Sequence, residues 1–148
     1  MAAGAGCTVA SRQEPGQATA AVADAIAEAG SAGETARITV ELLDQGRLTG
    51  PVADAALLDQ IRVLDDAEYA LVTLVPPDAA SASQRTTGLA AVGEVSDAVV
   101  AARAWVAARS GGDLAVADGV PGSTDELLAD LAAATDAADV ALTEAGGA

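Results

Sequence analysis

The chain has 148 residues, enough for one domain, and its 22 acidic and 7 basic side chains give a net charge of −15. An acidic surface repels phosphate backbones and anionic lipids, so we expect no nucleic acid and no membrane as partner. The sequence has no His and a single Cys, Cys7, so zinc, haem and di-iron sites of the bundle type lack their ligands. Ser-His-Asp and Cys-His catalysis are excluded on the same ground.

Small apolar residues dominate the composition and predict a helical protein with a thin core. Alanine occurs 40 times, whereas Leu, Ile and Val together occur 32 times and Phe is absent. Alanine has the highest intrinsic helix propensity but buries little apolar area per residue. No uncharged apolar run approaches the roughly 18 residues that a membrane-spanning helix needs, so we expect a cytoplasmic protein.

The charged residues are drawn from few residue types. All seven basic residues are Arg, and 14 Asp outnumber 8 Glu. This usage is similar in style to that of halophiles that accumulate salt, in which concentrated salt screens the mutual repulsion of the acidic side chains. A GC-rich genome would also favour Ala, Arg, Gly, Val and Asp codons. The composition leaves these two explanations open.

The first part of the chain predicts a tail followed by helix. Residues 1–16 are small and polar and predict a disordered tail, with Cys7 as a free thiol in it. A single helical-bundle domain is expected over residues 17–146. Its first helical stretch covers 17–30, and the glycines in Gly30-Ser31-Ala32-Gly33 predict a break or a bend there.

The helical pattern resumes over 34–45, and Gly46 fits as the residue just past its end. The sequence leaves open whether the stretches on either side of the two glycines form one helix or two.

A helical hairpin is expected in the middle of the chain. Helix 51–75 begins at Pro51, whose missing N–H needs no partner in a first turn, and ends at Pro76-Pro77. Apolar residues recur along it at helical spacing and predict its buried stripe: Leu57, Ile61, Leu64, Leu71 and Val75. Asp78 or Ser81 can cap helix 79–110, which carries its own apolar stripe.

The last helix is expected over 123–145. Ser123 and Glu126 resemble a capping box, in which each side chain accepts from the backbone N–H of the other residue. Residues 111–122 predict a loop, or at most a turn around Leu114. The helical stretches in series, joined by short connections, predict an all-α fold, an up-and-down four-helix bundle.

One arrangement of carboxylates could carry chemistry. Asp65 and Glu68 lie three residues apart on helix 51–75, and Glu94 and Asp97 lie three apart on the next helix. Antiparallel packing could bring these four carboxylates together as ligands for Mg²⁺, which binds carboxylate oxygens and substrate phosphates. Glu68 falls on the apolar stripe between Leu64 and Leu71, which favours a functional role for it, although helical over-winding or an Arg partner such as Arg103 would explain its position equally well.

The spacing of these acids resembles the paired acidic motifs of the MazG-type all-α nucleotide pyrophosphohydrolases. The resemblance covers those four residues and the helix after them, and it departs where Asp65 and Asp66 stand in for the family's Glu. It implies a Mg²⁺-dependent NTP pyrophosphohydrolase, with Arg62, Arg85 and Arg103 as candidates to bind phosphates. The competing interpretation is that the four acids are solvated surface, as expected in a chain with 22 acidic residues.

The preferred functional prediction is a non-catalytic protein. We expect a small regulatory or accessory subunit that acts by protein–protein contact, with a protein partner or a second copy of the chain and without a cofactor. A thin core gains stability when a second apolar face is buried in a partner. The predicted interaction face lies on helix 79–110 and consists of Ala90, Ala101, Ala104, Trp105 and Ala108.

Overall fold

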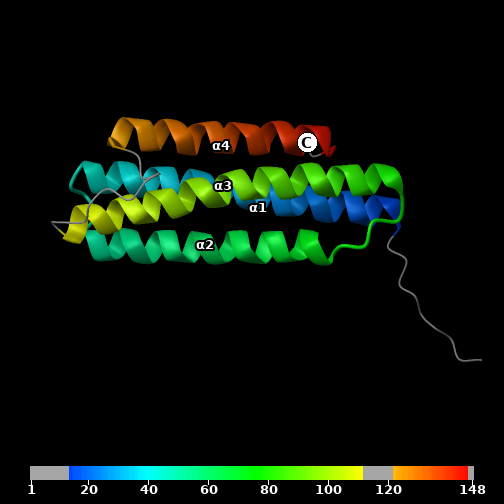
Figure 1. Ribbon diagram of the computed structural model, residues 1–148, viewed down its shortest axis with the longest axis horizontal. Coiled ribbons are helices and arrows are strands. Elements are labelled where there is room, and N and C mark those ends of the chain that lie inside the picture. The colour runs from blue at the N-terminus through cyan, green and yellow to red at the C-terminus, as the bar shows by residue number, and fades with distance from the viewer. Residues whose placement is uncertain (1–13, 112–121, 147–148) are drawn as a thin grey trace, which may run out of the picture.

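The computed structural model describes residues 14–111 and 122–146, and these residues form four α-helices (Figure 1). The helices are α1 (Pro15–Asp44), α2 (Gly50–Thr73), α3 (Ala79–Gly111) and α4 (Thr124–Glu144). Each helix runs antiparallel to the one before it, which confirms the predicted all-α four-helix bundle. The predicted tail lies outside the described residues up to residue 13, and so does most of the predicted loop, 112–121.

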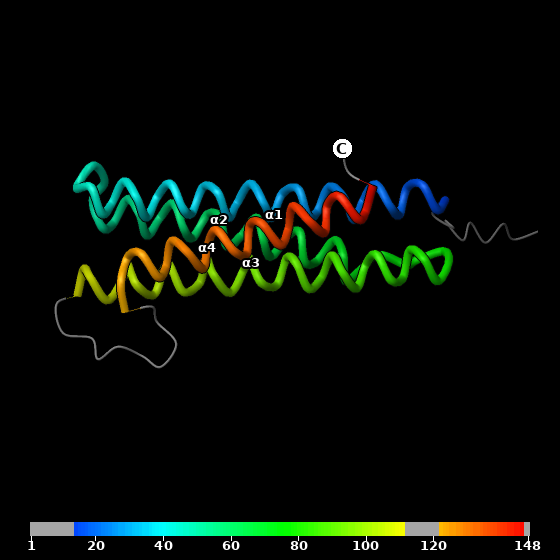
Figure 2. The backbone as a smooth tube through the Cα atoms, turned by 90° about the horizontal axis from the view of Figure 1, so that it is seen from above, coloured from blue at the N-terminus to red at the C-terminus, as the bar shows by residue number. Residues whose placement is uncertain are grey.

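The bundle is flattened, because two helices form its centre and two flank them. Helices α1 and α3 each contact the other three described helices, whereas α2 and α4 do not contact each other. Figure 1 shows α2 and α4 on opposite sides of the central pair, and Figure 2 shows the same bundle from above. Both outer helices consequently expose a broad surface to solvent. None of the described helices is long and apolar enough to cross a membrane.

The sequence left open whether the first helical stretch is one helix or two, and in the structure α1 continues through both glycines as a single helix. Gly33 is buried, and a Cβ atom there would lie 2.7 Å from Thr135 Oγ1 on α4 and 3.1 Å from Val95 Cγ1 on α3. Such distances are too short for ordinary carbon contacts. Gly33 therefore serves the close approach of three helices, and the weak helix propensity of glycine is overridden by this packing.

A second glycine, nearer the N-terminus of α3, has the same role. A Cβ atom on Gly88 of α3 would lie 3.1 Å from Val22 Cγ1 on α1 and 3.4 Å from Leu71 Cδ1 on α2. The two buried glycines and the many buried alanines explain how α1 and α3 pack against each other directly, because small side chains let helix axes approach.

The helix ends follow the local signals in the sequence. After α1, Gly46 has φ 70°, its N–H donates to the carbonyl of Leu43, and the N–H of Arg47 donates to the carbonyl of Leu42. This is the Schellman arrangement, and it confirms Gly46 as the terminating residue. Helix α2 ends at Thr73, two residues earlier than predicted, because Pro76 disfavours helical geometry in the residue before it.

Side-chain caps begin the last two helices. The carboxylate of Asp78 accepts from the N–H of Ser81 at 2.7 Å, so Asp78 is the cap of α3. The hydroxyl of Ser123 accepts from the N–H of Glu126 at 3.1 Å at the start of α4. Glu126 reaches back one residue further than a capping box predicts, since its carboxylate accepts from the N–H of Gly122 at 3.0 Å.

The core is continuous along the bundle and is thin, as predicted. Its largest fully buried side chains come from all four helices: Val22, Ile26, Val40, Leu57, Leu64, Leu71, Val92, Val95, Val99, Val106, Leu127 and Leu131. Ile61 is only partly buried, and Val75 is 76% exposed. The assignment of Val75 to the buried stripe was wrong, because the helix has already ended when the chain reaches it.

Candidate functional site

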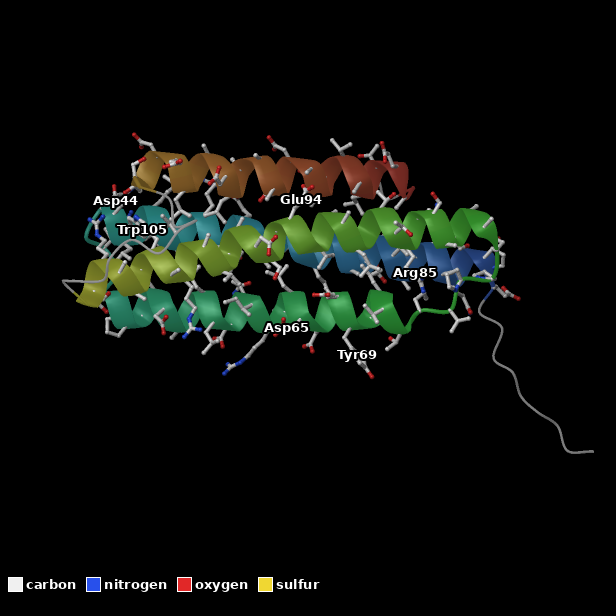
Figure 3. All side chains as sticks on the ribbon, viewed as in Figure 1. Asp44, Asp65, Tyr69, Arg85, Glu94 and Trp105 are labelled. Atoms are coloured by element: carbon white, nitrogen blue, oxygen red, sulfur yellow. The ribbon has the colours of Figure 1, made fainter. Side chains whose placement is uncertain are left out.

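The four carboxylates proposed for a metal site do not converge. Asp65, Glu68, Glu94 and Asp97 are all exposed. Glu94 borders a hollow between α3 and α4 with Ala137 and Val140, whereas α2 has no contact with α4. Figure 3 shows Asp65 and Glu94 on separate helices, with Glu94 on the side of α3 nearer α4. Within the described part of the chain, no group of three or more His, Cys, Asp or Glu side chains could hold a metal ion.

Glu68 does not lie in the buried stripe of α2. Its side chain is exposed, while Leu64 and Leu71 on either side of it in sequence are buried. It is not paired with Arg103, the suggested partner. The guanidinium of Arg103 donates from Nε to Asp54 at 2.8 Å, which ties α3 to α2 and raises the pKa of Arg103. The sequence spacing showed that Glu68 lies near the apolar stripe of α2. It did not show that Glu68 lies at the exposed edge of that stripe rather than at its buried centre.

The arginines named for phosphate binding each have another contact. Arg62 forms an ion pair with Asp59 on its own helix at 2.8 Å. Arg85 donates to the carbonyl of Leu74 at 3.0 Å, which holds the α2–α3 connection, and its buried Nε has no partner among the described atoms. Arg85 and Arg103 therefore join α3 to the end of α2 and to α2 itself, whereas Arg62 pairs only within its own helix.

The predicted interaction face on α3 is only partly accessible, since Trp105 is buried, Ala104 is half-buried and Ala90 is exposed. Trp105 is only 8% exposed and belongs to the core, and Ala101 and Ala108 are half-buried. The guanidinium of Arg109 lies over the indole ring, 5.0 Å from its centre, and forms an ion pair with Asp44 of α1 at 3.3 Å. Trp105 therefore contributes to the folded bundle itself, as a large apolar side chain with a cation over its face.

Asp44 also joins the fourth helix to this end of the bundle. The hydroxyl of Thr124, the first residue of α4, donates to the Asp44 carboxylate at 3.1 Å. The ends of α1, α3 and α4 are thus connected through one carboxylate. The cluster therefore links three helix ends, although exposed ion pairs of this kind contribute little to the free energy of unfolding.

Three large apolar side chains near the C-terminal end of α2 are strongly exposed. Tyr69 is 70% exposed, Val72 is 58% exposed and Val75 is 76% exposed. Tyr69 and Val72 are three residues apart and share one helix face, and Val75 follows just past the helix end. Figure 3 shows Tyr69 projecting away from the bundle. We call these three residues the α2 patch.

Acidic side chains border the α2 patch on its N-terminal side. Asp65, Asp66 and Glu68 are exposed, and we call them the patch carboxylates. Among the described residues, none of the three is within ion-pair distance of an arginine. The sequence interpretation overlooked this surface because it assigned Val75 to the buried stripe and gave Tyr69 no role. A helical projection carries the missing signal, since Tyr69 and Val72 fall outside the stripe of Leu57, Leu64 and Leu71.

An open groove between α1 and α2 adjoins this region. Its volume is about 680 Å³, and it is bordered by the carboxylates of Asp24, Glu28 and Asp66 together with Val63 and the hydroxyl of Ser31. No basic residue lines it among the described residues. Asp66 thus belongs both to the rim of the groove and to the patch carboxylates.

Besides Arg103, three titratable groups among the described residues have a shifted pKa, and each shift has a structural cause away from α2. The pKa of Arg37 is raised because its guanidinium donates to the carboxylate of Glu34. The pKa of Glu34 is lowered because its carboxylate accepts from the guanidinium of Arg37. The same guanidinium also forms an ion pair with Glu41, one turn further along, and the two ion pairs stabilise this part of α1. The pKa of Asp78 is lowered because its carboxylate accepts from the backbone of Ser81.

Comparison with known proteins finds no matching family model, no similar curated protein and no similar solved structure.

Proposed function

We propose that this chain is a non-catalytic helical bundle that acts by binding another protein, as a small regulatory or accessory subunit. The observation that supports this function is the α2 patch. It places Tyr69, the only Tyr of the chain, and Val72 on one exposed helix face, and Val75 is exposed just past the helix end. Apolar surface of this kind gains free energy when a partner covers it, at about 25 cal/mol per Å² of area removed from water. Clustered exposed apolar side chains mark interaction sites, whereas isolated ones need no explanation.

The position of the patch also favours binding. Helix α2 is an outer helix that contacts α1 and α3 but not α4, so its outer face is accessible along its length. Tyrosine is among the residues enriched at the energetic centre of protein interfaces. The side chains of Tyr69 and Val72 stand on a regular helix, which presents them with little loss of backbone entropy on binding.

Affinity purification from the native cells, with quantitative mass spectrometry, tests this function. The patch variant, Tyr69→Ala with Val72→Ala, removes the exposed apolar groups and keeps residues of high helix propensity. The matched control, Val100→Ala with Val140→Ala, truncates two valines that are 49% and 60% exposed on α3 and α4. A protein retained by the wild type and the control but lost from the patch variant is the expected result. Identical retention by all three proteins would contradict the proposal.

A further inference from the structure

The carboxylates around the α2 patch restrict the kind of protein that can cover it. Asp65 and Asp66 precede Tyr69 by four and three residues, so on a helix they are its neighbours on its two sides. Glu68 precedes Val72 by four residues and borders it in the same way. The apolar surface is therefore continuous with three exposed negative charges, all on the side toward the middle of α2.

Nearby cations do not neutralise this charge. The nearest arginine in sequence, Arg62, is already paired with Asp59 at 2.8 Å. Through Asp66 the negative surface continues into the groove between α1 and α2, where Asp24 and Glu28 add two more carboxylates. A partner that covers the patch consequently meets negative potential on the patch border and beyond it.

A second copy of this chain fits this surface poorly. A two-fold symmetric dimer through the patch would place each patch against itself, and the patch carboxylates of one copy would face those of the other. Each copy also carries a net charge of −15. Like charges brought together in an interface lose affinity and are a means of excluding a wrong partner. An anionic membrane is repelled for the same reason.

From this geometry we infer that the α2 patch binds a basic segment of a different protein. Apolar side chains of that segment cover Tyr69 and Val72, and its Lys or Arg side chains lie over the patch carboxylates. This inference rests on the proposed function and adds to it the chemical class of the partner. Complementary charge steers the encounter and fixes the register, while the apolar contacts at the centre supply most of the affinity.

Selection from a displayed library of random peptides shows which residue types bind to the α2 patch. The immobilised full-length wild type and the patch variant, Tyr69→Ala with Val72→Ala, are screened in parallel at physiological salt. Peptides enriched on the wild type and absent from the patch variant are expected to combine aromatic or aliphatic residues with Lys or Arg. Failure to enrich any peptide that depends on the patch would overturn the proposed function and the inference together. Enrichment of patch-dependent peptides that are neutral or acidic would overturn the inference alone.

The affinity of one selected peptide for charge variants then distinguishes attraction by the patch carboxylates from attraction by the net charge of the whole protein. Asp65→Asn with Glu68→Gln removes two patch carboxylates. Asp130→Asn with Asp136→Asn removes two exposed charges from α4, which does not contact α2. Neither pair forms an ion pair among the described residues, so both variants are expected to keep the fold.

The expected affinities differ between these variants. The patch variant should bind the peptide about tenfold more weakly or worse, as truncation of central interface residues does. The Asp65/Glu68 variant should bind several-fold more weakly and show a smaller salt dependence, whereas the Asp130/Asp136 variant should match the wild type within about twofold. Equal weakening by both charge variants would show that only overall charge attracts the peptide and would overturn the inference. A wild-type dimer in light scattering that is absent from the patch variant would also overturn it, because a second copy would then occupy the patch.

Discussion

Gly33 gives the most direct test of how the helices pack. In the interior of a helix, Gly→Ala ordinarily stabilises a protein by about 0.5–1 kcal/mol. At Gly33 the new methyl group would meet Thr135 Oγ1 at 2.7 Å and Val95 Cγ1 at 3.1 Å. The Thr135 hydroxyl cannot turn away freely, since it donates to the carbonyl of Leu131 at 2.8 Å. Overpacking of this kind costs about 1–3 kcal/mol, so we expect Gly33→Ala to destabilise the bundle by about 1 kcal/mol net.

Gly30, three residues earlier on α1, provides the matched control. A Cβ atom there would have only Asp139 Oδ1 nearby, at 3.9 Å. Gly30→Ala should therefore gain the full helix-propensity term, and thermal unfolding followed by circular dichroism should separate the two variants by about 3–9 °C. Adding Thr135→Ala to Gly33→Ala should restore part of the loss, because it removes the shorter contact. If Gly33→Ala were as stabilising as Gly30→Ala, α1 and α4 would not approach each other as described, and the role assigned to Gly33 would be wrong.

Four further predictions concern a helix cap, the core, the metal hypothesis and salt. The pKa of Asp78 in the folded protein is below its ordinary value of 3.8, so its stabilising contribution as a cap is present above pH 3.8 and is lost as pH falls through the folded-state pKa. Asp78→Ala should therefore lower the melting temperature near neutral pH and match the wild type in strong acid. Ser123→Ala, which removes a cap that does not titrate, should cost about 1 kcal/mol at neutral pH and in strong acid alike. Trp105→Ala should cost about 3–5 kcal/mol in urea unfolding, and a loss under 1 kcal/mol would refute its place in the core. Because Glu94 lies apart from the acids of α2, millimolar Mg²⁺ should leave the melting temperature unchanged, and a saturable rise abolished in Glu94→Gln would revive the metal site. If the surface is halophilic, the melting temperature should keep rising as the KCl concentration is increased into the molar range. A melting temperature that stays constant above roughly 0.2 M KCl, where the Debye length is already under about 8 Å, would favour codon usage as the origin of the acidity.

The features that the sequence predicted well depend on residues within one or two turns of each other. The end of α1 at Gly46 needs only a residue that tolerates positive φ, and the start of α3 needs only the Asp78 carboxylate three residues before the N–H it accepts from. The apolar repeat of Leu57, Leu64 and Leu71 likewise reports a buried face without any knowledge of what covers it. Local chemistry of this kind predicted the helical segments and their order along the chain, but it left open whether the first of them is one helix or two.

The candidate sites depended on contacts between helices, and there the sequence interpretation failed or stayed open. Trp105 was placed on a face for a partner to cover, but the packing of α3 in the centre of the bundle already buries it. Glu94 was grouped with the acids of α2, but it borders α4. Helical spacing shows which residues share a face, whereas the arrangement of the neighbouring helices determines what that face contacts.

The sequence by itself therefore determined the all-α class, the helix boundaries to within a few residues and the strong negative charge, because capping, periodicity and composition are local or additive properties. Only the tertiary structure decided that α1 and α3 form the centre and that α2 and α4 lie apart. In that arrangement Gly33, which by itself would be expected to break a helix, lies where α1 contacts α3 and α4 closely. The same arrangement leaves Tyr69 and Val72 exposed to solvent beside the patch carboxylates. The physical reason is that burial is a property of the whole bundle, since a side chain is covered or exposed according to helices that lie far from it in sequence.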